Sequence, residues 1–427
     1  MEKQDLFDAF DAARPRLQKL LGKKRTPLKK LVFLEQPAYD TYIKEETETD
    51  VHSFKIRGAY NAAAALKEAS PELKEIVASS AGNHAQGVAL SAKKLDLHAT
   101  IFMPASTPET KVYAVKQLGG SNVSIQLTGD NYDETSRAAK DYLQKSDGAF
   151  VHPFDDLNTI AGQATIADEI IAQSNGKNPF DYAFIQIGGG GLAAGVAARL
   201  KQEWPDIKII GVEGEGQASM KASIEADEVV ELETVNTFCD GTAVRRPGDI
   251  TFEICREYLD DIITVSNDEI CAAWDEIYRV ARATTEPSGV MGYAGSKRFA
   301  HQNPDLIEGK KVLTILSGGN VDPLKIAEMA KRAAVGAHEK QLYRITLDED
   351  TGRLLEVLDE LMEDIGVTDF LYGKNSLETA HPVIGFGASP ERLVELENRF
   401  KEQGINFQNV TNDIDVKKNN IPYSPEL

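Results

Sequence analysis

The chain has 427 residues, enough for two or three domains, and its 42% hydrophobic content supports ordinary folded cores. It carries 67 acidic and 47 basic residues, for a formal net charge of −20. This balance argues against nucleic-acid binding and against an anionic membrane surface, because both need basic patches. Three cysteines without CxxC spacing favour a reduced, cytoplasmic protein. We expect no signal peptide and no membrane helix.

The first part of the chain alternates short apolar runs with helical patterns, as a parallel α/β sheet requires. An amphipathic helix is expected to open the chain, with Leu6, Phe7 and Phe10 on its apolar side. Strands are expected at 75–80, 99–103, 124–127, 184–187, 209–213 and 312–316, and helices at 84–94 and 192–200.

From about Leu342 the pattern changes to the alternation typical of half-exposed antiparallel strands. The expected order is strand 342–347, turn 348–352, helix 353–364, strands 368–373 and 382–388, helix 390–403 and strand 405–410. This β-α-β-β-α-β order is that of a ferredoxin-like α+β module. We therefore expect an α/β catalytic domain over residues 1–335, and a linker plus this second domain over 336–427.

Gly188 to Gly191 lie between an apolar strand and a helix, in the segment FIQIGGGGLAAGVAARL. Glycines let consecutive backbone N–H groups curl around an anion, and the helix N-terminus adds its own free N–H groups. A flexible turn and a dinucleotide loop remain alternatives. The second would use Gly188, Gly190 and Ala193, with Glu213 as the acidic residue that follows.

Lys55 lies in the segment HSFKIRGAYNAAAAL, where Ser53 can cap the helix that follows. An ammonium in the first turn of a helix is disfavoured by the helix dipole, and burial lowers its pKa further. Such a lysine is a nucleophile able to form an imine. The alternative is an ordinary solvated lysine.

The segment SSAGNHAQG places Ser80, Ala81, Gly82 and Asn83 at another helix N-terminus. Its free N–H groups suit a substrate carboxylate, and Asn83 could donate to an oxygen on a cofactor ring. The alternative for Asn83 is simple helix capping. His84 is interpreted as structural.

Ser317 ends an apolar strand in VLTILSGGN, and the two glycines and Asn320 then turn the chain. A small hydroxyl at the carboxyl end of a strand lies where α/β sheets bind ligands. The alternative is a turn-forming serine.

Six motifs, SFKIRG, SAGNHAQG, HPFDD, IAGQATIADEI, GGGGL and SGGN, follow one another over residues 50–320. In this order they resemble the fold-type II pyridoxal-phosphate enzymes, and within them the threonine dehydratases (threonine ammonia-lyases). The carboxy-terminal module resembles the single ACT-like regulatory domain of the short biosynthetic forms. The resemblance implies two parallel-sheet α/β subdomains, the smaller one, about 50–155, inserted in the larger.

The resemblance also implies roles around a pyridoxal 5′-phosphate cofactor. Lys55 would be the catalytic residue and hold the cofactor as an imine, with Phe54 beside the pyridine ring. Asn83 would bond the ring 3′-oxygen, Ser317 would face the ring nitrogen, and Glu286 would lie near the cofactor. The phosphate would be held by Gly188, Gly189, Gly190, Gly191 and Leu192, and the substrate carboxylate by Ser80, Ala81, Gly82 and Asn83.

The implied reaction is β-elimination from L-threonine, and also from L-serine. From threonine it gives 2-oxobutanoate and ammonia, the first step of isoleucine biosynthesis. A neutral hydroxyl at Ser317 leaves the ring nitrogen unprotonated, which favours elimination over transamination. The resemblance further implies a homotetramer and allosteric inhibition by isoleucine or valine.

Other functions remain open. A serine racemase or a β-replacing pyridoxal enzyme would share the motifs. An NAD-dependent dehydrogenase would use only the glycine loop, and an amino-acid sensor would bind its ligand without turnover.

Related enzymes with a divalent cation carry further acidic residues after a similar VE segment. Here Glu213 is followed by Gln217 and Ser219, so we expect no metal site.

Overall fold

The computed structural model describes residues 2–22, 24–33, 37–348, 358, 365–371, 379–413 and 416. It divides into two compact units, Met1–Ser266 with Ile277–Val321, and Asn267–Glu276 with Asp322–Leu427. No helix in these described ranges is long and apolar enough to cross a membrane. The expected domain division at residues 335 and 336 stays a prediction.

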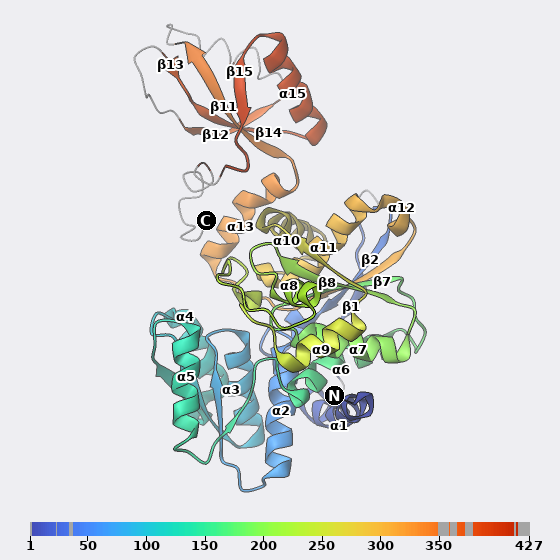
Figure 1. The fold of residues 1–427 in the computed structure, drawn as a ribbon, viewed down its shortest axis with the longest axis vertical. Coiled ribbons are helices and arrows are strands. Elements are labelled where there is room, and N and C mark those ends of the chain that lie inside the picture. The colour runs from blue at the N-terminus through green and yellow to red at the C-terminus, as the bar shows by residue number, and fades with distance from the viewer. Residues whose placement is uncertain are drawn as a thin grey trace. The chain divides into compact units, whose positions relative to one another are not determined.

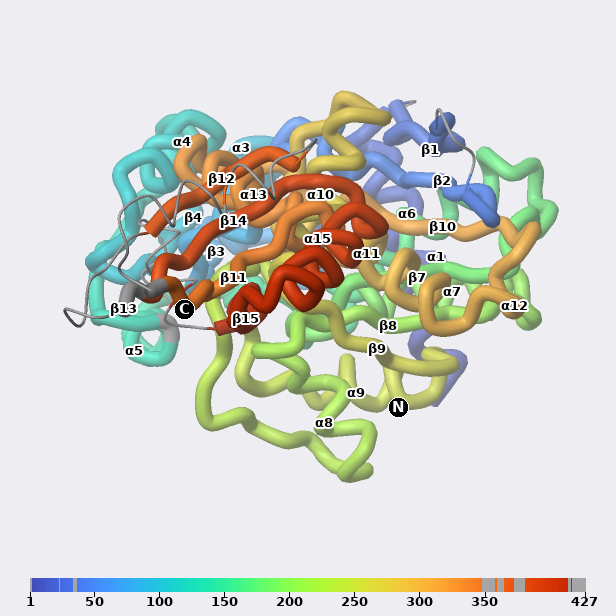
Figure 2. Tube along the Cα trace, turned by 90° about the horizontal axis from the view of Figure 1, so that it is seen from above, coloured from blue at the N-terminus to red at the C-terminus, as the bar shows by residue number. Residues whose placement is uncertain are grey.

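A six-stranded sheet forms the centre of the first unit, with the order β1-β2-β10-β7-β8-β9 that Figure 2 shows. All neighbours are parallel except β1 and β2. The expected strands at 184–187, 209–213 and 312–316 are present, whereas the sequence pattern did not predict β1, β2 and β9. The strands are β1 (Leu28–Lys30), β2 (Asp40–Glu45), β7 (Tyr182–Gln186), β8 (Lys208–Gly214), β9 (Asp261–Val265) and β10 (Lys311–Leu316).

Helices bury both faces of this sheet, which explains why its strands are continuous apolar runs. Ile185 belongs to the core beneath the helices α1, α6 and α7. Its neighbour Phe184 points to the other face, where its ring centroid lies 5.5 Å from that of Phe299 in α11. The helices around the sheet are α1 (Lys3–Leu21), α6 (Leu157–Gln173), α7 (Gly191–Glu203), α8 (Ser219–Ala226), α9 (Asp249–Tyr258), α11 (Pro287–Gln302) and α12 (Pro304–Ile307).

A second, four-stranded parallel sheet has the order β5-β4-β3-β6. Ile76 and Ile101 pack against α2, α3 and α4 on one face, and Val77 and Phe102 pack against α5 on the other. Figure 1 shows α3, α4 and α5 gathered in one body. The prediction of two parallel-sheet α/β subdomains is confirmed. The elements are β3 (Glu75–Ser79), β4 (His98–Met103), β5 (Val123–Leu127), β6 (Ala149–Phe150), α2 (Lys55–Ala69), α3 (Asn83–Leu95), α4 (Glu109–Gly119) and α5 (Tyr132–Leu143).

The carboxy-terminal sheet has the order β12-β14-β11-β15, all antiparallel, and a short β13 pairs with the end of β11. This is the ferredoxin-like order that the sequence predicts. The expected helix over 353–364 lies outside the described residues except at position 358, and the turn over 348–352 except at position 348. The elements are α10 (Asn267–Ala281), α13 (Pro323–Gly336), β11 (Lys340–Asp348), β12 (Gly366–Leu371), β13 (Thr379–Ala380), β14 (Val383–Gly387), α15 (Pro390–Glu402) and β15 (Asn406–Asn409).

Aromatic rings fill the core of this sheet and give a stability prediction. Phe400 is fully buried, and its ring centroid lies 5.4 Å from that of Tyr343 and 4.8 Å from that of Phe407. Phe400→Ala should therefore lower the free energy of unfolding of this unit by about 3–5 kcal/mol in urea denaturation. Val394→Ala, on the same helix at a 60% exposed position, is the control, and equal stability of both variants would contradict the packing.

Candidate active site

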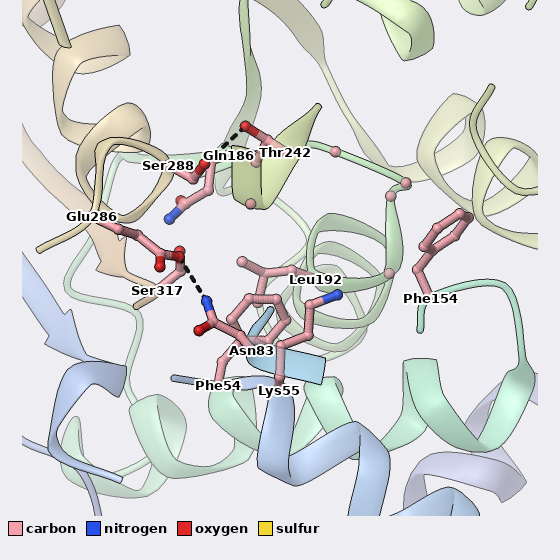
Figure 3. Close-up of a pocket in the computed structure, with 15 residues that line it drawn as sticks. Phe54, Lys55, Asn83, Phe154, Gln186, Leu192, Thr242, Glu286, Ser288 and Ser317 are labelled. Atoms are coloured by element: carbon pink, nitrogen blue, oxygen red, sulfur yellow. Dashed lines mark hydrogen bonds between the residues drawn. The ribbon is translucent and has the colours of Figure 1, made fainter. Parts of the chain in front are cut away.

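A pocket lies in the first unit, where strands β7 and β10 end and helices α2, α3 and α7 begin. Carboxyl ends of parallel strands and helix N-termini are the usual positions for ligands in α/β folds. Every residue predicted to bind the cofactor lines this pocket (Figure 3). Its lining is Phe54, Lys55, Asn83, Phe154, Gln186, Gly188, Gly189, Gly190, Gly191, Leu192, Gly241, Thr242, Glu286, Ser288 and Ser317.

Ser80, Ala81 and Gly82 are not among the lining residues. They are half-buried and form the turn between β3 and α3, directly before Asn83. A Cβ atom added at Gly82 would meet no atom within 4 Å, so there is open space beside this turn. The predicted substrate carboxylate site is therefore next to the pocket wall rather than part of it.

Lys55 is the first residue of α2, as predicted, although the capping differs from the prediction. The N-cap residue is Phe54, and the Ser53 hydroxyl accepts only a long bond, 3.4 Å, from the Lys55 N–H. The Lys55 Nζ donates to the carbonyl oxygen of Pro153 at 3.0 Å. Desolvation by the surrounding protein lowers the pKa of Lys55 to about 8, against the opposing effect of the Glu286 carboxylate.

This lowered pKa predicts the pH at which Lys55 reacts with acetic anhydride in the cofactor-free protein. Only the neutral amine reacts, so labelling should rise with pH through about 8, roughly two units below an ordinary lysine. Lys208 is the control, because its hydrogen bond to Asp260 raises its pKa. Mass spectrometry of both peptides measures the midpoints, and equal midpoints would contradict the burial of the Lys55 amine.

The glycine run forms a cup of backbone N–H groups at the start of α7. In the part of the chain that the structure describes, the N–H groups of Gly188 to Leu192 donate no hydrogen bond, whereas Ala194 bonds to Gly190 O. Gly190 has φ +97° and precedes the helix. An anionic phosphate fits this cup because several free donors and a helix N-terminus converge on it.

Neighbouring side chains leave no space for a Cβ atom at these glycines. A Cβ at Gly189 would lie 2.4 Å from the Phe154 ring, and one at Gly190 would lie 2.7 Å from Met220 Cε. The Thr251 hydroxyl donates to the Gly189 carbonyl at 2.6 Å and so holds the glycine loop in place. The glycines are therefore required by close packing as well as by backbone conformation.

Asn83 and Glu286 meet across the pocket. Asn83 Nδ2 donates to Glu286 Oε1 at 2.8 Å, which Figure 3 marks with a dashed line. The side-chain amide thus does not cap its own helix. Burial raises the pKa of Glu286 to about 7, and the nearby Asp240 charge adds to this, whereas Asn83, Lys111 and Lys55 oppose it. The family resemblance places Glu286 near the cofactor and implies only a weak role for it.

Ser317 lies where β10 ends and is held by its backbone. Its N–H donates to Gly289 O at 3.1 Å, and its carbonyl accepts from the Phe54 N–H at 3.0 Å. Figure 3 shows Ser317 beside Glu286 on the wall of the pocket. These bonds hold a neutral hydroxyl in place at the pocket surface.

Five lining residues were not predicted as site residues: Phe154, Gln186, Gly241, Thr242 and Ser288. Phe154 belongs to the HPFDD motif, and Gln186 is a polar residue in an apolar strand, so both carried a signal. Gln186 Nε2 donates to Ile315 O at 2.9 Å. Thr242 and Ser288 bond to each other at 3.1 Å, and nothing in their local sequence indicates this.

Glu213 decides against a dinucleotide site. Its side chain is fully buried, and its two oxygens accept the N–H groups of Met220 and Lys221 at 2.9 and 2.8 Å. A carboxylate that is fully buried and bonded to the start of α8 is not accessible to a ribose hydroxyl. Among the described residues, no three His, Cys, Asp or Glu side chains come together as metal ligands.

His84 is buried with its Nε2 atom 2.9 Å from Val151 O, and burial lowers the pKa of its ring to about 3. A ring that stays neutral and bonds to the backbone fits the structural role expected of it.

The chain matches the family model described as pyridoxal-phosphate dependent enzyme over residues 19–318. It is 39% identical over 400 residues to the L-threonine dehydratase biosynthetic IlvA of Haemophilus influenzae, covering 93% of this chain and 76% of the relative. The Staphylococcus aureus (strain MSSA476) protein of the same name is 37% identical over 423 residues, 97% of both chains.

Solved structures agree with this similarity. The processed form of threonine deaminase isoform 2 from Solanum lycopersicum superposes with a TM-score of 0.72 at 37% identity, over 78% of this chain and 94% of that one. Maize serine racemase gives a TM-score of 0.69 at 30% identity, over 78% and 98%. The predicted family is confirmed. The chain belongs to the pyridoxal-phosphate dependent enzymes and, within them, to the threonine dehydratase family.

Proposed function

We propose that this chain is a threonine ammonia-lyase that converts L-threonine to 2-oxobutanoate and ammonia, the first step of isoleucine biosynthesis. The observation that carries the proposal is that one pocket contains both a half-buried lysine with a lowered pKa and a cup of free N–H groups. Relatives named L-threonine dehydratase match nearly the whole chain and support the choice of substrate. L-Serine, with the same β-hydroxyl group, is proposed as a second substrate.

Pyridoxal phosphate, when bound, supplies an aldehyde that reacts with amines and a ring that withdraws electrons from the substrate Cα. We assign Lys55 as the residue that holds it, with Phe54 beside the ring. Asn83 would donate to the ring oxygen, and Ser317 would face the ring nitrogen. The phosphate is bound by the N–H groups of Gly188, Gly189, Gly190, Gly191 and Leu192.

Lys55 also serves as the base that removes the Cα proton. With a pKa of about 8, roughly one amine in ten is neutral at pH 7, far more than for an ordinary lysine. A base whose pKa lies near the working pH combines availability with proton affinity. Glu286, buried in the same pocket with a pKa raised to about 7, is a nearby group that can hold a proton.

The substrate carboxylate is proposed to bind at the start of α3, against the backbone of Ser80, Ala81, Gly82 and Asn83. The N–H groups of Ser80 and Gly82 are already bonded, to Phe102 O at 3.0 Å and to Ser80 Oγ at 3.2 Å. The proposed site therefore depends on the N–H groups in the first turn of α3 and on the positive end of the dipole of this 13-residue helix. The open space beside Gly82 leaves room for this group.

Product analysis tests the proposal. Purified protein supplied with pyridoxal phosphate should convert L-threonine to 2-oxobutanoate and ammonia in equal amounts, with a visible absorption band from the bound cofactor. D-Serine from L-serine, or a thioether from serine and a thiol, with no oxo acid would instead favour a racemase or a β-replacing enzyme. Binding of amino acids without turnover would favour a sensor.

Regulation and assembly form a further part of the proposal. We propose that residues 1–335 are the catalytic domain and 336–427 a linker and ACT-like regulatory domain, in a cytoplasmic homotetramer.

Isoleucine, or valine in its place, would bind the second domain and change turnover by binding more tightly to one of two conformational states of the enzyme. Truncation before Leu342 tests this, because isoleucine should then no longer inhibit. Equal inhibition of both forms would refute the regulatory role.

A further inference from the structure

A chain of side-chain hydrogen bonds leads from the backbone into the pocket. Asn320, in the turn after β10, donates from Nδ2 to Val51 O at 2.8 Å and to Asn83 Oδ1 at 2.8 Å. Asn83 in turn donates from Nδ2 to Glu286 Oε1 at 2.8 Å. Val51, Asn83, Glu286 and Asn320 belong to four separate segments of the first unit. The chain of bonds therefore exists only in the folded protein.

Val51 sets the direction of these bonds. A backbone carbonyl can only accept, so Asn320 must turn its NH₂ group towards Val51. The second N–H of that group then points at Asn83, which must present its oxygen. If the Asn83 amide were flipped, two NH₂ groups would face each other. The orientation of the Asn83 amide thus follows from the network rather than from the amide itself.

Asn83 keeps one N–H donor that no hydrogen bond of this network uses. Its oxygen accepts from Asn320 and one of its two N–H groups donates to Glu286, so one N–H remains. Asn83 lines the pocket, and Figure 3 shows its amide between Glu286 and the Phe54 ring. The side chain can therefore act on a ligand as a donor through this remaining N–H.

We propose that Asn320 is a positioning residue that fixes the Asn83 amide as a hydrogen-bond donor to the bound cofactor. The inference rests on the proposed contact between Asn83 and the ring oxygen. A fixed donor stabilises that oxygen in its anionic form, because a charge-assisted bond is stronger than a neutral one. If the Asn83 amide were free to rotate, it would present its Oδ1 atom to the ring oxygen of the cofactor for part of the time. These two oxygens would then repel each other.

The test replaces Asn320 by the isosteric acid. In Asn320→Asp the new carboxylate accepts but cannot donate, so Asn83 should turn its NH₂ group to it and lose its donor in the pocket. We expect the absorption maximum of bound pyridoxal phosphate to shift and its dissociation constant to rise about ten-fold or more, the value of one bond to a charged group. Unchanged absorption and affinity would overturn the inference.

Asn122→Asp is the matched control. Asn122 Nδ2 also donates to a backbone carbonyl, Leu97 O, at 2.8 Å, but Asn122 is not among the residues that line the pocket. It should leave the absorption maximum and the affinity for the cofactor unchanged. A merely structural role of Asn320, tying its turn to Val51, would lower the melting temperature but would not move the absorption maximum.

Two more variants keep the result decisive. If Asn320→Asp does not fold, Asn320→Ser replaces it, because a serine hydroxyl is too short to reach both Val51 and Asn83. Its absorption maximum should shift in the same way, and an unchanged one refutes the inference.

Asn83→Ala distinguishes a failure of this inference from a failure of the proposed function. If it weakens cofactor binding while both Asn320 variants match the wild type, the inference fails and the proposed function stands. If Asn83→Ala has no effect, the proposed Asn83 contact itself is wrong.

Discussion

Lys55→Ala is expected to lower threonine turnover by at least about 10³-fold, because one substitution removes both the attachment of the cofactor and the base. The structure gives no substitute for it in the pocket. No other lysine is among the residues that line the pocket. His84 and His152, whose rings feel the charge of Lys55, do not line the pocket, and burial lowers the pKa of both. Turnover is measured as release of 2-oxobutanoate.

Lys67→Ala is the control for this loss, because Lys67 lies on the same helix and binds a backbone carbonyl, Leu95 O, away from the pocket. It should retain wild-type turnover. Circular dichroism should show the same fold for both variants. Turnover of Lys55→Ala within ten-fold of the wild type would rule out the assigned role of this amine.

Gly190→Ala should weaken the binding of pyridoxal phosphate by about 100-fold or more. Gly190 has φ +97°, which costs an L residue of the order of 1–2 kcal/mol. The added Cβ would also lie 2.7 Å from Met220 Cε and 2.7 Å from Thr251 Cβ, both in fully buried side chains. The loop must shift to relieve these contacts, and the N–H groups that bind the phosphate shift with it.

Gly176→Ala separates backbone strain from this clash. Gly176 also has a positive φ, +72°, but a Cβ there would meet no atom within 4 Å. It should cost some stability and leave cofactor affinity unchanged. Titration with pyridoxal phosphate, followed by absorbance, measures both variants. Wild-type affinity of Gly190→Ala would show that the glycine cup does not depend on its observed conformation.

The features that sequence predicted well are those that depend on neighbours along the chain. A strand, four glycines and a helix that follow one another in the chain form the phosphate cup. The position of Lys55 at the start of α2 also follows from its neighbours in the sequence. Propensity and spacing therefore located these groups before any tertiary contact was known. The Ser53 cap was predicted one position away from the observed N-cap, Phe54, which is the usual uncertainty at a helix end.

The features that sequence missed join distant segments. Asn83 and Glu286 were both expected near the cofactor, but the hydrogen bond between them was not predicted, because they are 203 residues apart in the chain. Strand β2 was missed because its sequence, DTYIKE, is mostly polar, although Thr41, Lys44 and Glu45 are buried where it pairs with β10, more than 250 residues later in the chain. No local pattern can report such a pairing.

Arg57 of the SFKIRG motif is a further example. It is fully buried, and its guanidinium bonds to Glu46 at 2.7 Å and to Glu169 at 2.8 Å. Lys44, also buried, bonds to the same Glu169 at 2.7 Å. This ion network connects α2, the helix that begins with Lys55, to β2 and α6. Arg57 therefore has a structural role that the sequence of the motif alone does not indicate.

Reduction of the loaded protein with borohydride tests most directly whether Lys55 holds the cofactor. After incubation with pyridoxal phosphate and reduction, the cofactor should be fixed covalently to the peptide that contains Lys55, and mass spectrometry should find it at that residue in most of the protein. A cofactor fixed to another lysine while Lys55 stays unmodified would contradict the assignment of this site.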